Sequence, residues 1–181
     1  MAGWLRRVHY RVQQFFAALQ ARVTPAEVAA LGSVLPPAGL DLFCRMPAAD
    51  QRHSLDVYAA LQHAGYRDAD LLAAALLHDV AKAGHIRIWH RVALVLLKAV
   101  TPGRHVLHRL AQPAAANSVR YPFYVSVHHP ALGAQQALAA GCSARTAWLI
   151  AQHQTPLAGV HAAEPQLVVL LQALQKVDDE L

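Results

Sequence analysis

The spacing of apolar residues predicts helices along most of the chain. Trp4, Val8, Phe15 and Leu19 recur at helical intervals and predict an amphipathic helix over residues 3–22. Further apolar stretches predict helices at about 25–31, 37–45, 47–63, 69–82, 87–100, 130–140, 144–153 and 165–180, with a helical turn or two after Thr101. Residues 111–125 contain several breakers and predict an irregular, mobile loop, and 123–127 is the only short strand candidate. We therefore expect an all-α fold.

Local signals mark where these helices begin and end. Thr24 followed by Pro25 and Glu27 is typical of a capping box with proline at the first helical position. Asp68 and Ser143 are placed to cap the helices that follow them. No repeat or low-complexity linker divides the chain. We expect residues 1–46 to form helices packed on the core and residues 47–181 to form the main helical domain.

Composition limits the classes of protein that fit. The 181 residues are 55% hydrophobic and 15% charged, which is too apolar for disorder and sufficient for one core. A net charge of +5 favours anionic partners such as phosphates, nucleotides or acidic lipid. Cys44 and Cys142 lie in unrelated contexts, and we find no signal peptide or membrane-spanning run, so we expect free thiols and a cytoplasmic protein. No nucleic-acid partner is expected, because aromatic and basic residues do not interleave.

Candidate chemistry comes from the histidines, which number 12 against 11 aspartates and glutamates together. Four of them and two aspartates lie on separate predicted helices: His53, His78, Asp79, His129, His153 and Asp178. Such a set suffices for two metal ions with open positions for water and substrate. Imidazole suits Fe, Mn, Co, Ni and Zn, and the carboxylates favour Fe or Mn. No cysteine joins the set, so a structural zinc knot is not expected.

The order of these residues resembles the HD-domain metal-dependent phosphohydrolase superfamily over residues 47–181. The resemblance rests on the whole ordered set, on the string HDVAK that begins at His78, and on the spacing His-Pro-x-x-Gly that begins at His129. It implies a single HD-type helical domain and one or two divalent metal ions. The implied activity is hydrolysis of a phosphoester, in a nucleotide or another small phosphorylated metabolite, by a metal-bound hydroxide.

The resemblance also assigns roles to single residues. It implies a first metal bound by His53, His78, Asp79 and Asp178, and a second metal bound by Asp79, His129 and His153. Asp79 and Lys82 would be the catalytic residues, with Lys82 stabilising a phosphate oxygen or forming a salt bridge to Asp79. Gln154 stands where richer sites of the superfamily have a further histidine, and no GYP segment follows His153. Both departures argue against the cyclic di-GMP phosphodiesterases.

Several alternatives stay open at this point. His128 competes with His129 as a ligand, and Asp179 competes with Asp178. Arg52, which precedes His53, is either a phosphate contact or part of a structural ion pair. Residues 86–110, a basic segment with an apolar face, fit a buried helix, a lid, a dimer contact or a peripheral membrane contact. An HD-type di-iron oxygenase and a non-catalytic nucleotide-sensing or scaffold module are the alternative functions, and a homo-oligomer is compatible with the sequence.

Overall fold

The computed structural model describes residues 22–84, 103–161 and 164–181, and every regular element in these ranges is helical. The predicted all-α fold is therefore confirmed for this part of the chain. The helix predicted over residues 3–22 and most of the segment 86–110 lie outside the described residues. The elements are α2 (Pro25–Ala30), η1 (Leu31–Ser33), α3 (Pro37–Cys44), α4 (Ala48–His63), α5 (Ala69–Leu77), η2 (Val80–Lys82), α7 (Gly103–Leu110), α8 (Tyr121–Ala139), α9 (Ala144–Gln152), η3 (Leu157–Gly159) and α10 (Pro165–Glu180).

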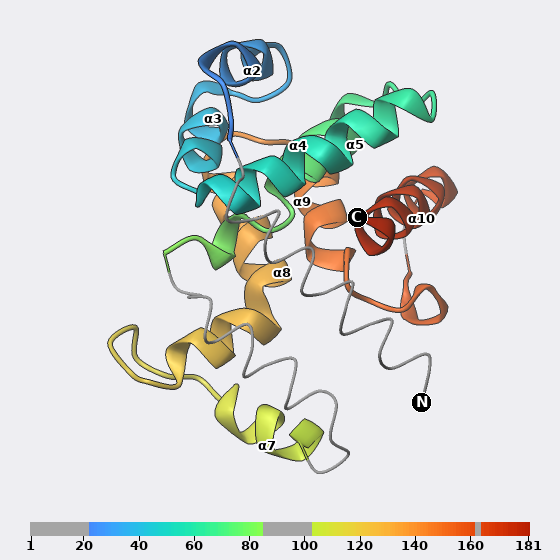
Figure 1. Cartoon of the computed structure of the whole chain (residues 1–181). Helices are drawn as coiled ribbons and strands as arrows, with labels where there is room; N and C mark the ends of the chain where they lie inside the picture. Colours follow the sequence, from blue (N-terminus) through green and yellow to red (C-terminus); the bar gives the residue numbers. More distant parts are fainter. Residues whose placement is uncertain (1–21, 85–102, 162–163) are drawn as a thin grey trace, which may run out of the picture.

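Helix α5 is the centre of the described core. Its residues from Leu71 to Leu77 are all buried, so neighbours must cover it on every side. Helices α3, α4, α9 and α10 pack against it. Figure 1 shows α4 and α5 side by side, the long helix α8 leading away from them, and α10 at the edge of the molecule. The end of α5, where His78 follows Leu77, therefore lies deep in the helical assembly.

The predicted caps are present. Thr24 and Glu27 form a reciprocal capping box at the start of α2. Asp68 accepts the amide of Leu71 at 2.9 Å, and Ser143 accepts the amide of Thr146 at 3.0 Å. Each cap satisfies an amide that the first turn of its helix leaves without a partner.

Helices α5 and α9 are fastened together at their starts. The carboxylate of Asp70, in the first turn of α5, accepts hydrogen bonds from Ser143, from Arg145 Nε at 3.0 Å and from Thr146 Oγ1 at 3.0 Å. Both helices have 9 residues, and each is followed at once by a candidate histidine, His78 or His153. Two packed helices of equal length with joined starts bring the residues after their ends together, and the two imidazole centroids are 5.2 Å apart.

Two predicted boundaries are wrong. Helix α5 ends at Leu77 and a separate 3-10 turn follows, whereas the apolar pattern predicted one helix to about residue 82. Helix α8 begins at Tyr121 and passes through Pro130 without a break. The loop predicted for residues 111–125 therefore ends at residue 120, and residues 123–127 are helical rather than a strand. Pro122 lies in the first turn of α8, where its missing amide costs no hydrogen bond.

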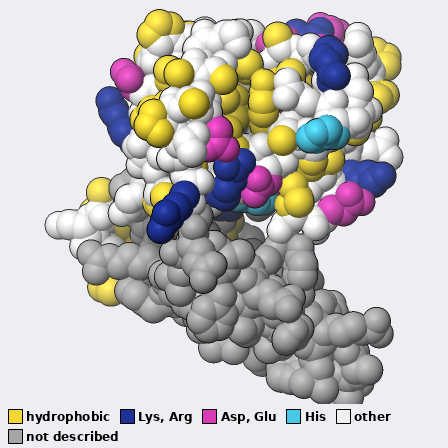
Figure 2. Space-filling model, turned by 45° about the horizontal axis from the view of Figure 1, so that its top comes forward, with side chains coloured by type: hydrophobic (Ala, Val, Ile, Leu, Met, Phe, Trp, Pro, Cys, Tyr) yellow, Lys and Arg dark blue, Asp and Glu magenta, His cyan; other side chains and the backbone are white. Residues whose placement is uncertain are grey.

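One face of the described part is mixed in charge. Figure 2 shows Lys and Arg side chains interspersed with Asp and Glu on the face that it displays. No helix among the described residues is long and apolar enough to cross a membrane. Cys44 and Cys142 are both free thiols, as predicted.

Candidate metal centre

The structure brings all six predicted metal ligands together, from five parts of the fold. His53 lies on α4, His129 on α8 and Asp178 on α10, whereas His78 and His153 follow the last residues of α5 and α9. Asp79 leads into η2. The side chains form two groups, each with ligand atoms within 4.8 Å of one another: His53, His78 and Asp178 in the first, and Asp79, His129 and His153 in the second.

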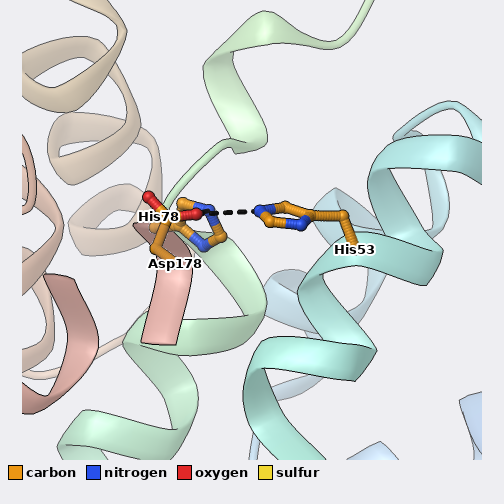
Figure 3. Close-up of side chains that lie close together, drawn as sticks. All are labelled: His53, His78 and Asp178. Atoms are coloured by element: carbon orange, nitrogen blue, oxygen red, sulfur yellow. Dashed lines mark hydrogen bonds and ion pairs between the residues drawn. The ribbon is translucent and has the colours of Figure 1, made fainter. Parts of the chain in front are cut away.

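The first group centres on the carboxylate of Asp178. Its Oδ1 lies 2.8 Å from His53 Nε2 and 3.3 Å from His78 Nε2. Figure 3 shows the ring of His53 pointing from α4 towards Asp178, with the ring of His78 beside the carboxylate. The His53 side chain is 30% exposed and that of His78 is fully buried, so this group spans from the interior to solvent.

The second group centres on Asp79 Oδ1. This oxygen lies 3.3 Å from His129 Nε2 and 3.8 Å from His153 Nε2. The two imidazole nitrogens are themselves 3.2 Å apart. His129 and His153 are almost fully buried. Three potential ligand atoms therefore face one small volume inside the protein.

Asp79 also connects the two groups. Its Oδ1 is 3.8 Å from His78 Nε2, and His78 belongs to the first group. Its other oxygen, Oδ2, binds Lys82 Nζ at 2.7 Å. This geometry suits the predicted position of Asp79 between two metal ions. The bond between Asp79 and Lys82 is the salt bridge that we gave above as one of two roles for Lys82.

Three of the histidines are held in the same way. Nδ1 of His78 lies 2.9 Å from the carbonyl of Ala75, that of His129 lies 3.0 Å from the carbonyl of Ser126, and that of His153 lies 2.7 Å from the carbonyl of Ile150. A carbonyl only accepts, so in each pair the imidazole donates and carries its hydrogen on Nδ1. In its neutral form such a ring presents a lone pair on Nε2, the atom that faces the group, as His129 and His153 do and as His78 would after losing its second proton. A backbone partner of this kind fixes ligating histidines in metalloproteins.

Charge and burial set the protonation of the group. Burial lowers the pKa of His78, but the negative charges of Asp79 and Asp178 outweigh it and raise that pKa to about 9. Burial lowers the pKa of His129, and burial with the nearby His78 lowers that of His153 to about 3. Burial acts to raise the pKa of Asp79, but the ammonium of Lys82 together with the neighbouring imidazoles of His78 and His129 outweighs it and holds the pKa well below its usual range. The hydrogen bond with His53 and the charge of His78 overcome burial in the same way and lower the pKa of Asp178.

The protonation of the second group suits a cation. His129 and His153 are neutral and carry their hydrogens on Nδ1, so two Nε2 lone pairs and the charged Asp79 Oδ1 meet with no hydrogen between them. His78 Nε2 and Asp79 Oδ1 are buried and make no hydrogen bond of good geometry among the described residues. Buried polar atoms without partners are rare in folded proteins, and two of those among the described residues belong to proposed ligands. Neutral imidazole with carboxylate is a donor set for divalent transition metals.

The structure also separates the competing candidates. His128 Nε2 lies 3.2 Å from the carbonyl of Ala111, and its ring stacks near Tyr124, so it is placed outside both groups. Asp179 is exposed and belongs to neither group. Arg52 binds Glu27 at 2.6 Å and Asp56 at 2.9 Å. These contacts correspond to the structural ion pair, the second of the two roles considered for Arg52, and not to a phosphate contact.

One supporting residue gave no signal in the sequence. Gln175 on α10 donates from Nε2 to the carbonyls of Gln152, at 3.2 Å, and Thr155, at 2.8 Å. It lies one turn before Asp178 and holds the segment around His153, so it ties the two groups together. An isolated glutamine on an amphipathic helix has no motif that would reveal such a contact.

Comparisons with protein-family models, with curated proteins and with solved structures give no match to this chain.

Proposed function

We propose that this protein is a metal-dependent phosphohydrolase that cleaves a phosphoester of a small metabolite. The observation that carries the proposal is the meeting of two His/Asp groups at one carboxylate, Asp79. The resemblance of the ordered ligand set to the HD-domain superfamily supports the reaction type. Phosphoester hydrolysis is a reaction that paired metal ions serve well, because they stabilise charge on both the attacking and the leaving oxygen.

The residues present fit two divalent ions. His53, His78 and Asp178 would hold the first, Asp79, His129 and His153 would hold the second, and Asp79 would contact both. Their donor set suits Fe, Mn, Co, Ni or Zn. When bound, the metals supply Lewis acidity and a water of lowered pKa as the nucleophile.

The chain's own residues divide the remaining work. His78, His129 and His153 are buried and form the closed side of the centre. The His53 and Asp178 side chains are 30% and 21% exposed, so substrate approaches from the first group. Lys82, 20% exposed beside Asp79, would neutralise a phosphate oxygen as charge develops on it.

The test combines metal analysis with a phosphatase screen. Purified protein, loaded with Mn²⁺ or Co²⁺ and kept free of oxygen, is assayed for phosphate release from nucleotides and sugar phosphates. We expect metal-dependent release by the wild type. Lys82→Ala should retain its metal, because lysine is not a ligand, and should lose turnover by roughly 10²–10³-fold. Lys176→Ala, a change at a lysine on α10 that belongs to neither group, is the matched control and should keep full activity.

Two results would contradict the proposal. The first is a wild-type protein that binds metal but releases no phosphate from any substrate and consumes oxygen with a polyol or phosphonate. That result would replace the hydrolase with the di-iron oxygenase. The second is a protein that binds metal and stays inert in both assays, which would favour the non-catalytic module.

A further inference from the structure

Pro130 occupies an unfavourable place, in the interior of α8. Proline there removes a helix hydrogen bond and crowds the preceding turn, so alanine would normally be the more stable choice. The helix nevertheless continues from Tyr121 to Ala139. Pro130 directly follows His129, a proposed ligand of the second metal. The position of the proline therefore calls for an explanation that helix stability does not give.

The hydrogen bonds around Pro130 supply that explanation. In an α-helix the carbonyl of Ser126 accepts from the amide four residues later, which is residue 130. Proline has no amide hydrogen, so it leaves this carbonyl without its helical donor. His129 takes the place of that donor, with Nδ1 at 3.0 Å from the Ser126 carbonyl. The same bond fixes the hydrogen on Nδ1 and the lone pair on Nε2.

The other two buried histidines reach the same geometry without a proline. His78 and His153 donate to the carbonyls of Ala75 and Ile150, again three residues earlier. Both follow the last residue of a helix, where carbonyls lack helical donors. His129 lies well before the end of α8, where every carbonyl would normally be occupied. A histidine in the middle of a helix can take the carbonyl three residues earlier as its own acceptor only if the amide that normally binds that carbonyl is absent.

We propose that Pro130 is a positioning residue: by withholding its amide it reserves the Ser126 carbonyl for His129 Nδ1 and so aims His129 Nε2 at the second metal group. The effect on metal affinity rests on the proposed function. The effect on the imidazole hydrogen does not, because it concerns the metal-free protein.

Pro130→Ala restores the competing amide. The N–H of the introduced alanine would bind the Ser126 carbonyl, and His129 Nδ1 would lose its partner. Asp79 Oδ1, at 3.3 Å from Nε2, would then attract the ring hydrogen to Nε2. Loss of an outer partner of a ligating histidine weakens metal binding by about 10–100-fold. The same change removes an interior proline, so the melting temperature should rise by about 5 °C.

The experiment compares the whole chain with three separate variants of it. Pro130→Ala carries the competing amide. The second variant has the ester analogue of alanine at position 130, which has the same side chain and no N–H. Pro122→Ala is the matched control, because Pro122 lies in the first turn of α8. The readouts are the ¹⁵N shifts of the His129 ring without metal, the Mn²⁺ affinity and the melting temperature.

The proposal expects His129 to carry its hydrogen on Nδ1 in the wild type, in the ester variant and in Pro122→Ala, and to shift towards Nε2–H in Pro130→Ala alone. Mn²⁺ affinity should fall only in that variant, and the ester should restore it. Unchanged ring shifts in Pro130→Ala would overturn the proposal, as would equal Mn²⁺ binding by the amide and ester variants. If wild type binds no metal, the proposed function fails, and the ring shifts still decide the role of Pro130.

Discussion

Metal binding should expel a proton from His78. In the metal-free protein the carboxylates around this buried imidazole raise its pKa to about 9. At pH 7 about 99% of His78 is therefore protonated, and a protonated imidazole has no lone pair for a metal. His129 and His153 add nothing to this proton count, because burial keeps both neutral at that pH.

The size of the effect follows from the pKa. About two pH units below the pKa of His78, proton competition weakens metal binding by roughly 100-fold, or about 3 kcal/mol. Apparent affinity at the first group should therefore rise about tenfold for each pH unit between pH 7 and about 9, where the gain levels off. The affinity rises with pH because the raised pKa leaves the extra proton on the metal-free protein. That proton stabilises the metal-free form below the pKa of His78, and this stabilisation is lost as the pH rises through that value.

Isothermal titration calorimetry measures this directly. Mn²⁺ is titrated into the metal-free protein in buffers of different ionisation enthalpy at about pH 7.5, and we expect release of about one proton. His63→Asn, a change at an exposed histidine at the end of α4, is the control and should release the same amount. Metal binding with no proton release, or an affinity that is flat between about pH 7 and 8.5, would refute the assigned protonation of His78.

Two further predictions concern the packing that positions the site. Gly133→Ala places a Cβ at 3.3 Å from Ile150 Cγ2 and 3.4 Å from Val80 Cγ1. The free energy of unfolding, measured by urea denaturation, should therefore fall by about 1–3 kcal/mol. Gly32→Ala, with open space around it, is the control and should be nearly neutral. Asp70→Ala removes the acceptor that joins the starts of α5 and α9, which should lower the free energy of unfolding by about 1–3 kcal/mol and weaken Mn²⁺ binding; unchanged values for both would contradict this role.

Local chemistry explains why much of the fold could be predicted. The capping residues Thr24, Asp68 and Ser143 act on amides within three positions, so their effect is visible in a short window. The end of α5 was missed because the residues after Leu77 remain buried. The pattern of burial continues there although the backbone leaves the helix.

Helix α8 shows what a local pattern cannot contain. Pro130 normally argues against a helix interior, and it is tolerated here because His129 replaces the missing donor at the Ser126 carbonyl. The side chain that makes this replacement is also a proposed metal ligand. Departures from local preference of this kind are expected where function sets the sequence.

The candidate site was predictable as a set but not in its details. The order of the four histidines and two aspartates indicated convergence, and the structure brings all six together. The sequence assigned His129 rather than His128, and Asp178 rather than Asp179, through the resemblance alone. The physical basis of the choice is the face of each helix that turns to the core, which the structure supplies. The support from Gln175 depends on contacts between α10 and the segment after α9, which no spacing within one helix reveals.

Anomalous X-ray diffraction from crystals grown with Mn²⁺ would show whether the six residues bind metal ions. Two anomalous peaks are expected, one at ligand distance from His53, His78 and Asp178, and one at ligand distance from His129 and His153, with Asp79 contacting both. Strong Mn²⁺ peaks confined to other parts of the surface, or none at the six residues under saturating Mn²⁺, would contradict a two-metal centre.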